Sequence, residues 1–167
     1  MAIHVSNMKE LNRALQPVLL KMVDQLADRV YETLNYFLLD YYKGYNPSSY
    51  QRTKDFLYSA VKVDAHPYKG GVKASVYIDY DSLNSNRGVT GYQVAKWADE
   101  GLHGGMEVDH KPHVWQDTID NTVNNGELLK LAVEYLKSHG ISVFLPEEID
   151  EYIKEMRDND RFSDCPQ

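Results

Sequence analysis

The sequence predicts an α+β protein in which a long N-terminal amphipathic helix and several shorter helices pack on a small antiparallel β-sheet. Three patterns support this prediction: helical spacing of apolar residues near the N-terminus, apolar–polar alternation between residues 61 and 80, and helical spacing again after residue 114. A length of 167 residues and an apolar fraction of 43% fit one globular domain. We therefore expect a single domain over residues 1–158 and a flexible C-terminal tail over residues 159–167.

Residues 7–42 carry the strongest helical pattern. Apolar residues recur there at three- and four-residue steps, which places them on one side of a helix: Met8, Leu11, Leu15, Val18, Met22, Leu26, Val30, Leu34, Phe37 and Tyr41. Asn7 and Glu10 resemble a capping box at the start, and Gly44 predicts the end. Pro17 should kink or break the helix just before it, because proline removes a backbone hydrogen bond and clashes with the preceding turn.

Residues 61–80 have the pattern of a β-hairpin. Val61, Val63 and Ala65 alternate with charged residues in the first strand. After 66-HPYKGG-71 the apolar residues of a second strand alternate with polar ones: Val72, Ala74, Val76, Ile78 and Tyr80. We expect two antiparallel strands joined by a loop over residues 66–71, each with its apolar residues on one buried face.

The rest of the chain predicts short helices separated by loops. A short helix could begin at Ser49, before the hairpin. After the hairpin we expect an exposed loop, a short helix, a polar loop and three further helices: residues 81–91, 93–100, 101–112, 114–123, 127–139 and a last segment after Pro146.

Charge and composition exclude several functional classes. The net charge is −7, and the 18 Lys and Arg residues are spread along the sequence, so we expect no sequence-specific binding to nucleic acid and no binding to anionic membrane. No apolar run approaches the roughly 20 residues that span a bilayer, and the N-terminus lacks a signal-peptide pattern, so we expect a cytoplasmic chain. The single Cys165 cannot form a disulfide within the chain. We expect no cofactor.

The segment 103-HGGMEVDHKPH-113 is the best candidate for a metal site. It holds three of the 6 histidines, and His103, Asp109, His110 and His113 are residue types that bind transition metals. Part of it also resembles the Val-Asp-His strand of HNH-type nucleases, which supplies a general base and a metal ligand. Pro112 disfavours the helix that would bring these side chains together, and basic residues to hold a phosphodiester are scarce nearby. We therefore expect a solvated polar loop without catalytic residues.

A resemblance to a known family rests on the order of elements and on short motifs. The long helix is followed by 45-YNPSSYQRTKDFLYS-59, the hairpin, 97-WADEGLHGG-105 and a closing helix that ends in 135-YLKSHGI-141. This order resembles the small neck, or tail-completion, proteins of long-tailed double-stranded DNA bacteriophages. The residues at matching places are Tyr50, Arg52, Thr53, Leu57, Ser59, Trp97, Glu100, Gly101, Gly104, Gly105 and Trp115.

The resemblance implies a noncatalytic structural protein of a phage or prophage, which forms a ring at the head–tail junction. Its partners would be further copies of itself and other neck, connector or tail subunits, and it would be assembled into the virion in the host cytoplasm. The candidate contact residues are Tyr41, Tyr42, Tyr45, Trp97, Gly101, Gly104 and Gly105. Two alternatives stay open: a metal-dependent HNH-type nuclease and an intracellular protein-binding module.

Overall fold

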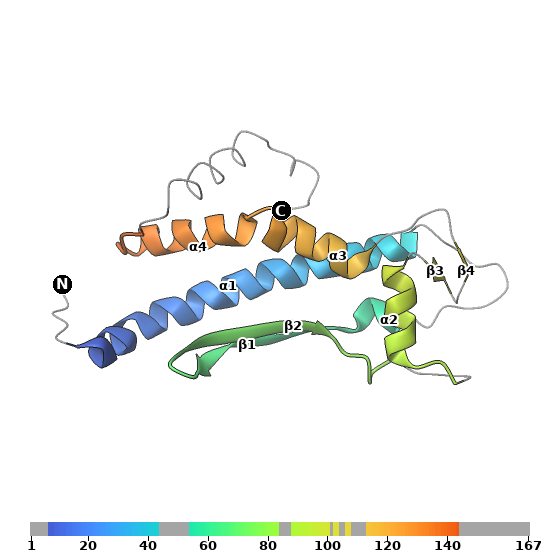
Figure 1. Ribbon diagram of the computed structural model, residues 1–167, viewed down its shortest axis with the longest axis horizontal. Helices are drawn as coiled ribbons and strands as arrows, with labels where there is room; N and C mark the ends of the chain where they lie inside the picture. Colours follow the sequence, from blue (N-terminus) through green and yellow to red (C-terminus); the bar gives the residue numbers. More distant parts are fainter. Residues whose placement is uncertain are drawn as a thin grey trace.

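The protein is an elongated α+β structure built along one helix (Figure 1). The computed structural model describes residues 7–43, 54–83, 88–100, 102–103, 106–107 and 113–143. Its elements, in chain order, are α1 (Met8–Lys43), a 3₁₀ turn (Phe56–Tyr58), β1 (Ala60–Tyr68), β2 (Gly71–Ile78), α2 (Gly91–Asp99), β3 (Leu102–His103), β4 (Met106–Glu107), α3 (Val114–Ile119), a π-helical turn (Asp120–Asn124) and α4 (Glu127–Ser138). The hairpin β1–β2, α3 and α4 all pack against α1. The predicted fold class is confirmed.

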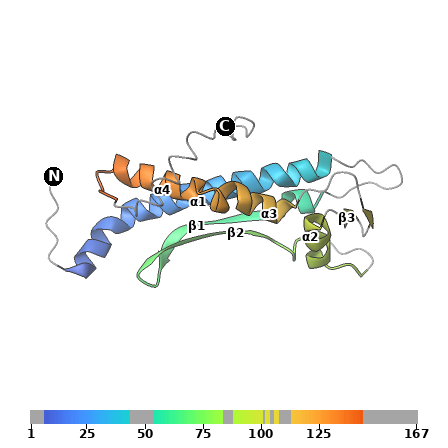
Figure 2. The same cartoon turned by 45° about the horizontal axis from the view of Figure 1, so that its top comes forward.

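Helix α1 begins where the sequence predicted. The backbone N–H of Glu10 donates a hydrogen bond of 3.0 Å to Oδ1 of Asn7, which satisfies one of the free N–H groups at the helix start. The helix continues through Pro17 to Lys43, so a break at the proline is wrong. Figure 2 shows the first turns set at an angle to the rest of α1, as expected of a proline kink.

The hairpin is longer, and its turn tighter, than the sequence predicted. Both strands extend into the expected loop, and Tyr68 pairs with Gly71 across a two-residue turn. Lys69 and Gly70 both have positive φ, 46° and 80°, as a tight hairpin turn requires. Pro67 is tolerated because each strand of a two-stranded sheet is an edge.

The buried face of β1 is not the one that the alternation predicted. The side chain of Lys62 is only 16% exposed and points to α1, whereas Val63 is 38% exposed. In β2 the prediction holds better, because Ile78 is buried and Val76 packs against the core. A register irregularity between Val63 and His66 then shifts the pairing along β1, as in a β-bulge.

Helix α2 begins earlier than expected, because a capping box precedes it. The backbone N–H of Thr90 donates to Oε1 of Gln93 at 2.8 Å, and the N–H of Gln93 donates to Oγ1 of Thr90 at 3.2 Å. Helix α4 ends near Gly140, as predicted: this residue has a φ of 73°, and the N–H of Ile141 returns to the carbonyl of Leu136.

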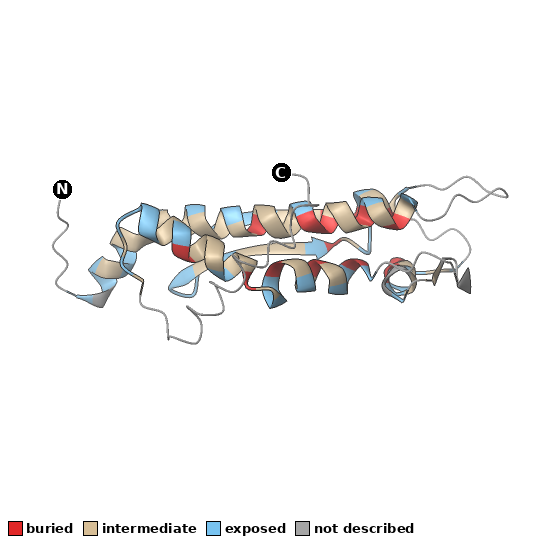
Figure 3. Ribbon diagram, turned by 90° about the horizontal axis from the view of Figure 1, so that it is seen from above, coloured by how far each residue is buried: buried red, intermediate tan, exposed pale blue. Residues whose placement is uncertain are grey.

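The core lies along the C-terminal half of α1. Figure 3 shows the buried residues of α1 concentrated there and facing those of α3. The buried cluster consists of Leu34, Leu38, Tyr41, Phe56, Ala60, Ile78, Leu83, Ala95 and Val114. Buried hydroxyls are satisfied within their own helices; that of Thr122, for example, donates to the carbonyl of Thr118 at 2.7 Å. The hairpin base, α2 and α3 are thereby joined through α1.

Several predictions fall on residues outside the described part. These are the short helix expected from Ser49, the last helix after Pro146, the tail over residues 159–167 and the domain limit at residue 158. The expected loop over residues 101–112 is described only in part, and there β3 and β4 form a short antiparallel pair. None of the described helices combines the length and apolar character needed to cross a membrane.

Candidate functional surfaces

The histidine-rich segment is described only at its two ends. His103 lies in β3 opposite Met106, and His113 directly precedes α3. The backbone N–H of His113 donates to Oδ2 of Asp117 at 3.0 Å, so the side chain of Asp117 in α3 holds the backbone at this end of the segment. Asp109 and His110 lie outside the described residues. Among those described, no group of three or more His, Cys, Asp or Glu side chains is placed to hold a metal ion. The expectation of a solvated polar loop in place of a metal site therefore stays a prediction.

Asn121, Asn124 and His139, which follow the histidine-rich segment in the chain, are bonded within their own helical turns. Nδ2 of Asn121 donates to the carbonyl of Asp117 at 2.8 Å, and Nδ2 of Asn124 donates to Asp120 at 2.6 Å. The His139 ring stacks on Tyr135 at a centroid distance of 4.3 Å. These contacts account for the three residues as parts of helix ends.

The predicted contact residues lie in different environments. Tyr41 is a core residue with 6% exposure, and its hydroxyl donates to the carbonyl of Leu102 at 3.3 Å. Tyr42 is half-buried and packs edge-on against Tyr41 at 5.4 Å, and Trp97 is half-buried on α2. Tyr41 thus serves the core rather than an exposed surface. The remaining candidates, Tyr45, Gly101, Gly104 and Gly105, lie outside the described residues.

Two exposed tyrosines, Tyr68 and Tyr77, lie on the hairpin, where the sequence patterns predicted no contact surface. The register puts Val61, Val63, Ser75 and Tyr77 on the face of the hairpin opposite to Lys62, hence turned away from α1. Val63 is 38% exposed and Tyr77 is 45% exposed. The signal was present in the sequence, because the large residue at 77 alternates with the core residues on either side of it.

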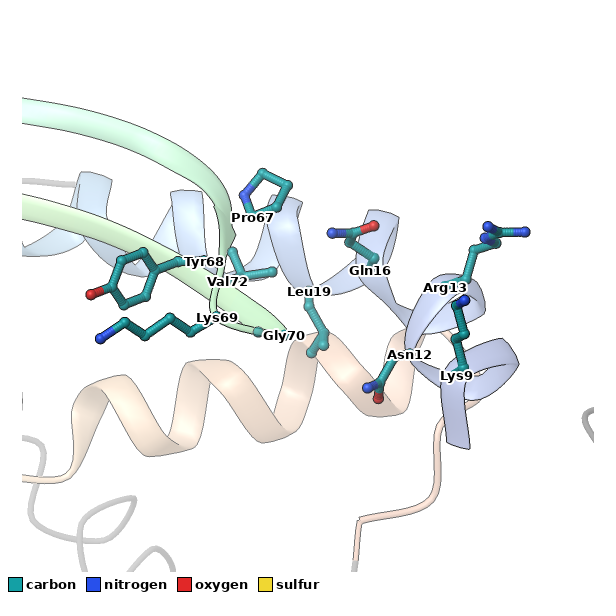
Figure 4. Close-up of a pocket in the computed structure, with 11 residues that line it drawn as sticks. Lys9, Asn12, Arg13, Gln16, Leu19, Pro67, Tyr68, Lys69, Gly70 and Val72 are labelled. Atoms are coloured by element: carbon teal, nitrogen blue, oxygen red, sulfur yellow. The ribbon is translucent and has the colours of Figure 1, made fainter. Parts of the chain in front are cut away.

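One end of the molecule is basic. Lys9 and Arg13 of α1, together with Lys69 at the hairpin turn, line a cavity of about 350 Å³ (Figure 4). None of the described residues lining it carries a carboxylate. The ammonium groups of Lys69 and Lys73 each lie 5.2 Å from the centroid of the Tyr68 ring. We call Lys9, Arg13, Lys69 and Lys73 the basic end.

A second cavity, also about 350 Å³, lies at the opposite end of β2. It is lined by aromatic side chains and two carboxylates, which together we call the aromatic hollow: Tyr77, Ile78, Asp79, Tyr80, Asp81 and Trp115. Oδ1 of Asp79 accepts hydrogen bonds from the backbone N–H groups of Asp81 and Ser82. This turn fixes the backbone at the rim of the hollow. Tyr80 is further supported by the Tyr92 ring, edge-on at 5.8 Å.

An ion-pair network holds the hairpin on α1. Nζ of Lys62 lies 3.1 Å from Oδ1 of Asp24 and also donates to Asp28, and Asp24 accepts the backbone N–H of Ala65 at 3.1 Å. The hydrogen bond from Ala65, followed by that from Lys62, lowers the pKa of Asp24 below its usual 3.8. The bond to Asp28 is the main cause that raises the pKa of Lys62 above its usual 10.5. The network therefore holds the middle of β1 on α1.

These observations define an α+β protein that carries exposed aromatic surfaces and separates a basic end from an acidic, aromatic hollow. The YomN family model matches residues 7–138, a range that contains every described element from α1 to α4. The chain belongs to the YomN family, a phage-type, prophage-derived family, and is therefore a phage-associated protein. Searches of curated proteins and of solved structures give no significant match.

Proposed function

We propose that this chain is a noncatalytic structural protein of the phage particle, which forms a ring at the head–tail junction as a neck or tail-completion subunit. The observation that carries the proposal is the exposed aromatic surface on the outer face and at the base of the hairpin. Aromatic residues are enriched in protein–protein interfaces, because they bury a large area at a small cost in side-chain entropy. In a chain of a phage-type family, such a surface is suited to contacts within the particle.

Two further properties support this role. The fold is long and is organised on one helix of 36 residues, so different subunits can contact widely separated parts of it. The net charge of −7 suits a subunit beside a DNA conduit, because an acidic lining repels the passing phosphates. The partners would be further copies of the chain and other neck, connector or tail subunits, assembled in the host cytoplasm and retained in the virion.

Electron microscopy of an induced lysate tests the assembly role. In the test lysate a stop codon interrupts this reading frame alone, and the control lysate also receives the intact gene from a plasmid. We expect DNA-filled heads beside unattached tails, with joined particles restored by the plasmid. Normally joined particles without the protein would overturn the assignment to the head–tail junction.

The noncatalytic part of the proposal has its own test. Purified protein is incubated with supercoiled plasmid and Mg²⁺ or Mn²⁺, alongside a His110→Ala variant. We expect no nicking by either protein. Nicking by the wild type that the variant has lost would replace the structural role with an HNH-type nuclease.

A further inference from the structure

We propose that the hairpin tip of one copy of this protein docks into the aromatic hollow of a second copy. The contact would be head-to-tail, because it joins two different surfaces. It rests on the proposed function in one respect: it supplies the subunit–subunit contact from which a ring could be built.

The hairpin tip is built to enter an acidic, aromatic site. It projects Tyr68, which is 45% exposed, with the ammonium groups of Lys69 and Lys73 held beside its ring. The tight turn and the Lys62 network on α1 hold this tip in place before any contact forms. A preorganised tip loses less conformational entropy on binding than a flexible loop would.

The aromatic hollow has the matching chemistry. Its two carboxylates, Asp79 and Asp81, can pair with the ammonium groups of the tip. Tyr77, Tyr80 and Trp115 surround them and are each more than a third exposed, at 45%, 45% and 37%. Their ring faces can contact both Tyr68 and the lysines of an incoming tip, through aromatic packing and cation–π interactions.

The two surfaces cannot meet within one chain. Six residues of extended chain separate Lys73 of the tip from Asp79, the nearer carboxylate of the hollow, which corresponds to about 20 Å at roughly 3.3 Å per residue. A contact between them therefore requires a second molecule. The described part of the chain carries one tip and one hollow, so the same contact can be repeated from copy to copy.

Nucleic acid is the competing ligand for the basic end, because phosphates also bind lysine and arginine. A DNA-binding role would leave the aromatic hollow, which is acidic, without a use. The contact between copies uses both surfaces and needs no positive net charge in a chain that carries −7. We therefore favour a second copy as the occupant.

Zero-length cross-linking with a carbodiimide tests the contact directly. A mixture of ¹⁵N-labelled and unlabelled full-length protein distinguishes bonds between molecules from bonds within one molecule. We expect amide bonds from Lys69 or Lys73 to Asp79 or Asp81 that join labelled with unlabelled peptides. Their absence at high protein concentration and low salt would overturn the proposal.

Charge reversal tests the energetics. Sedimentation or native mass spectrometry should show self-association of the wild type at least about tenfold weakened in Lys69→Glu/Lys73→Glu, and similarly weakened in Asp81→Lys. The matched control, Lys21→Glu/Lys137→Glu, makes the same charge change at exposed positions outside both surfaces and should associate as the wild type does. Mixing the tip variant with the Asp81→Lys variant should restore association between the two, because the intact tip of one fits the intact hollow of the other.

The other outcomes decide against the proposal. If the control variant loses association to the same degree, the weakening comes from the change in net charge and not from the proposed contact. A closed, reciprocal wild-type dimer would replace the head-to-tail contact, and binding of duplex DNA that only the tip variant loses would assign the tip to phosphates. The two proposals can also fail separately. If the protein associates through these cross-links but phage particles form normally without it, the proposed function is wrong and the contact between copies stands.

Discussion

At the scale of the residue, Lys62 shows how one side chain can reverse an expected pattern. It stands between two valines in a strand, where alternation alone predicts an exposed lysine. Its partners Asp24 and Asp28 lie 38 and 34 residues earlier in the chain, on the face of α1 that the hairpin covers. The aliphatic part of a lysine can cover an apolar surface while its ammonium group reaches carboxylates at the edge. The pairing of Lys62 with the carboxylates of α1 therefore explains both the buried lysine and the exposed Val63.

The same network predicts how stability depends on pH. Because the pKa of Asp24 is lowered in the folded protein, its contribution is fully present above the usual value of 3.8 and is lost as the pH falls through the folded pKa. The pKa of Lys62 is raised, so its contribution is present below 10.5 and is lost only as the pH rises beyond that value. We expect thermal unfolding of the wild type, followed by circular dichroism, to show an acid decrease in Tm that begins near pH 4 and is shallower in Asp24→Asn.

The variant should also have a slightly lower Tm at pH 7; the decrease should be small, because the Asp24 side chain is 38% exposed. Asp64→Asn is the matched control: its carboxylate also lies near Lys62, at 3.3 Å, but is 83% exposed. An identical acid profile for Asp24→Asn and the wild type would show that Asp24 does not stabilise the folded state in this way.

At the scale of the element, the position of α2 depends on a glycine at its first residue. A Cβ atom placed on Gly91 would lie 2.0 Å from the carbonyl oxygen of Tyr80 and 2.9 Å from Cβ of Leu83. The nearest of these atoms belongs to the backbone, so it cannot move aside by a change of rotamer. Four residues later Ala95, also small and buried, continues the same face of the helix. Small side chains therefore allow α2 to pack closely on the segment that follows β2.

We predict that Gly91→Ala destabilises the protein by about 1–3 kcal/mol, although alanine is the better helix former. The loss comes from overpacking, because α2 must move away from Tyr80. Urea denaturation, followed by tryptophan fluorescence, measures the change and includes the signal of Trp97 on α2. Gly71→Ala serves as the control: its added Cβ would lie 3.7 Å from the nearest atom, and its effect should be within about 0.5 kcal/mol. A Gly91→Ala variant as stable as the wild type would contradict the close packing.

Sequence alone predicted those elements whose causes are local. The cap at Asn7 and the end of α4 at Gly140 depend on residues within a few positions, and the structure has both. The capping box of Thr90 and Gln93 was equally local but was passed over, which placed the start of α2 too late. The sequence could not predict which face of β1 is buried, because this depends on Lys62 meeting Asp24, which is far away in the chain. It could not predict the basic end either, because only the fold brings Lys9 close to Lys69.

At the scale of the whole molecule, α1 is the element that joins the others. The hairpin, α3 and α4 each pack against it. Leu34 and Leu38 are fully buried in the cluster that also contains the base of the hairpin and the first residue of α3. In addition, Nε of Arg29 donates to Oε1 of Glu127 at 2.8 Å, which links α1 to α4. A protein organised in this way should unfold as one unit, since the hairpin, α3 and α4 all lose their main packing partner when α1 is lost.

We therefore predict that Leu34→Ala lowers the stability of all elements together, by about 2–5 kcal/mol, because a fully buried leucine leaves a cavity when it is truncated. Leu39→Ala is the matched control on the same helix: this leucine is 49% exposed, and its loss should cost about 1 kcal/mol or less. In urea, far-ultraviolet circular dichroism follows mainly α1 and α4, whereas fluorescence follows Trp97 on α2 and Trp115 on α3. The two transitions should coincide in the wild type and move together in the variant. A tryptophan transition that stayed in place while the helical signal moved would show that α2 and α3 hold together without the long helix, and α1 would lose its role as the element that unites the fold.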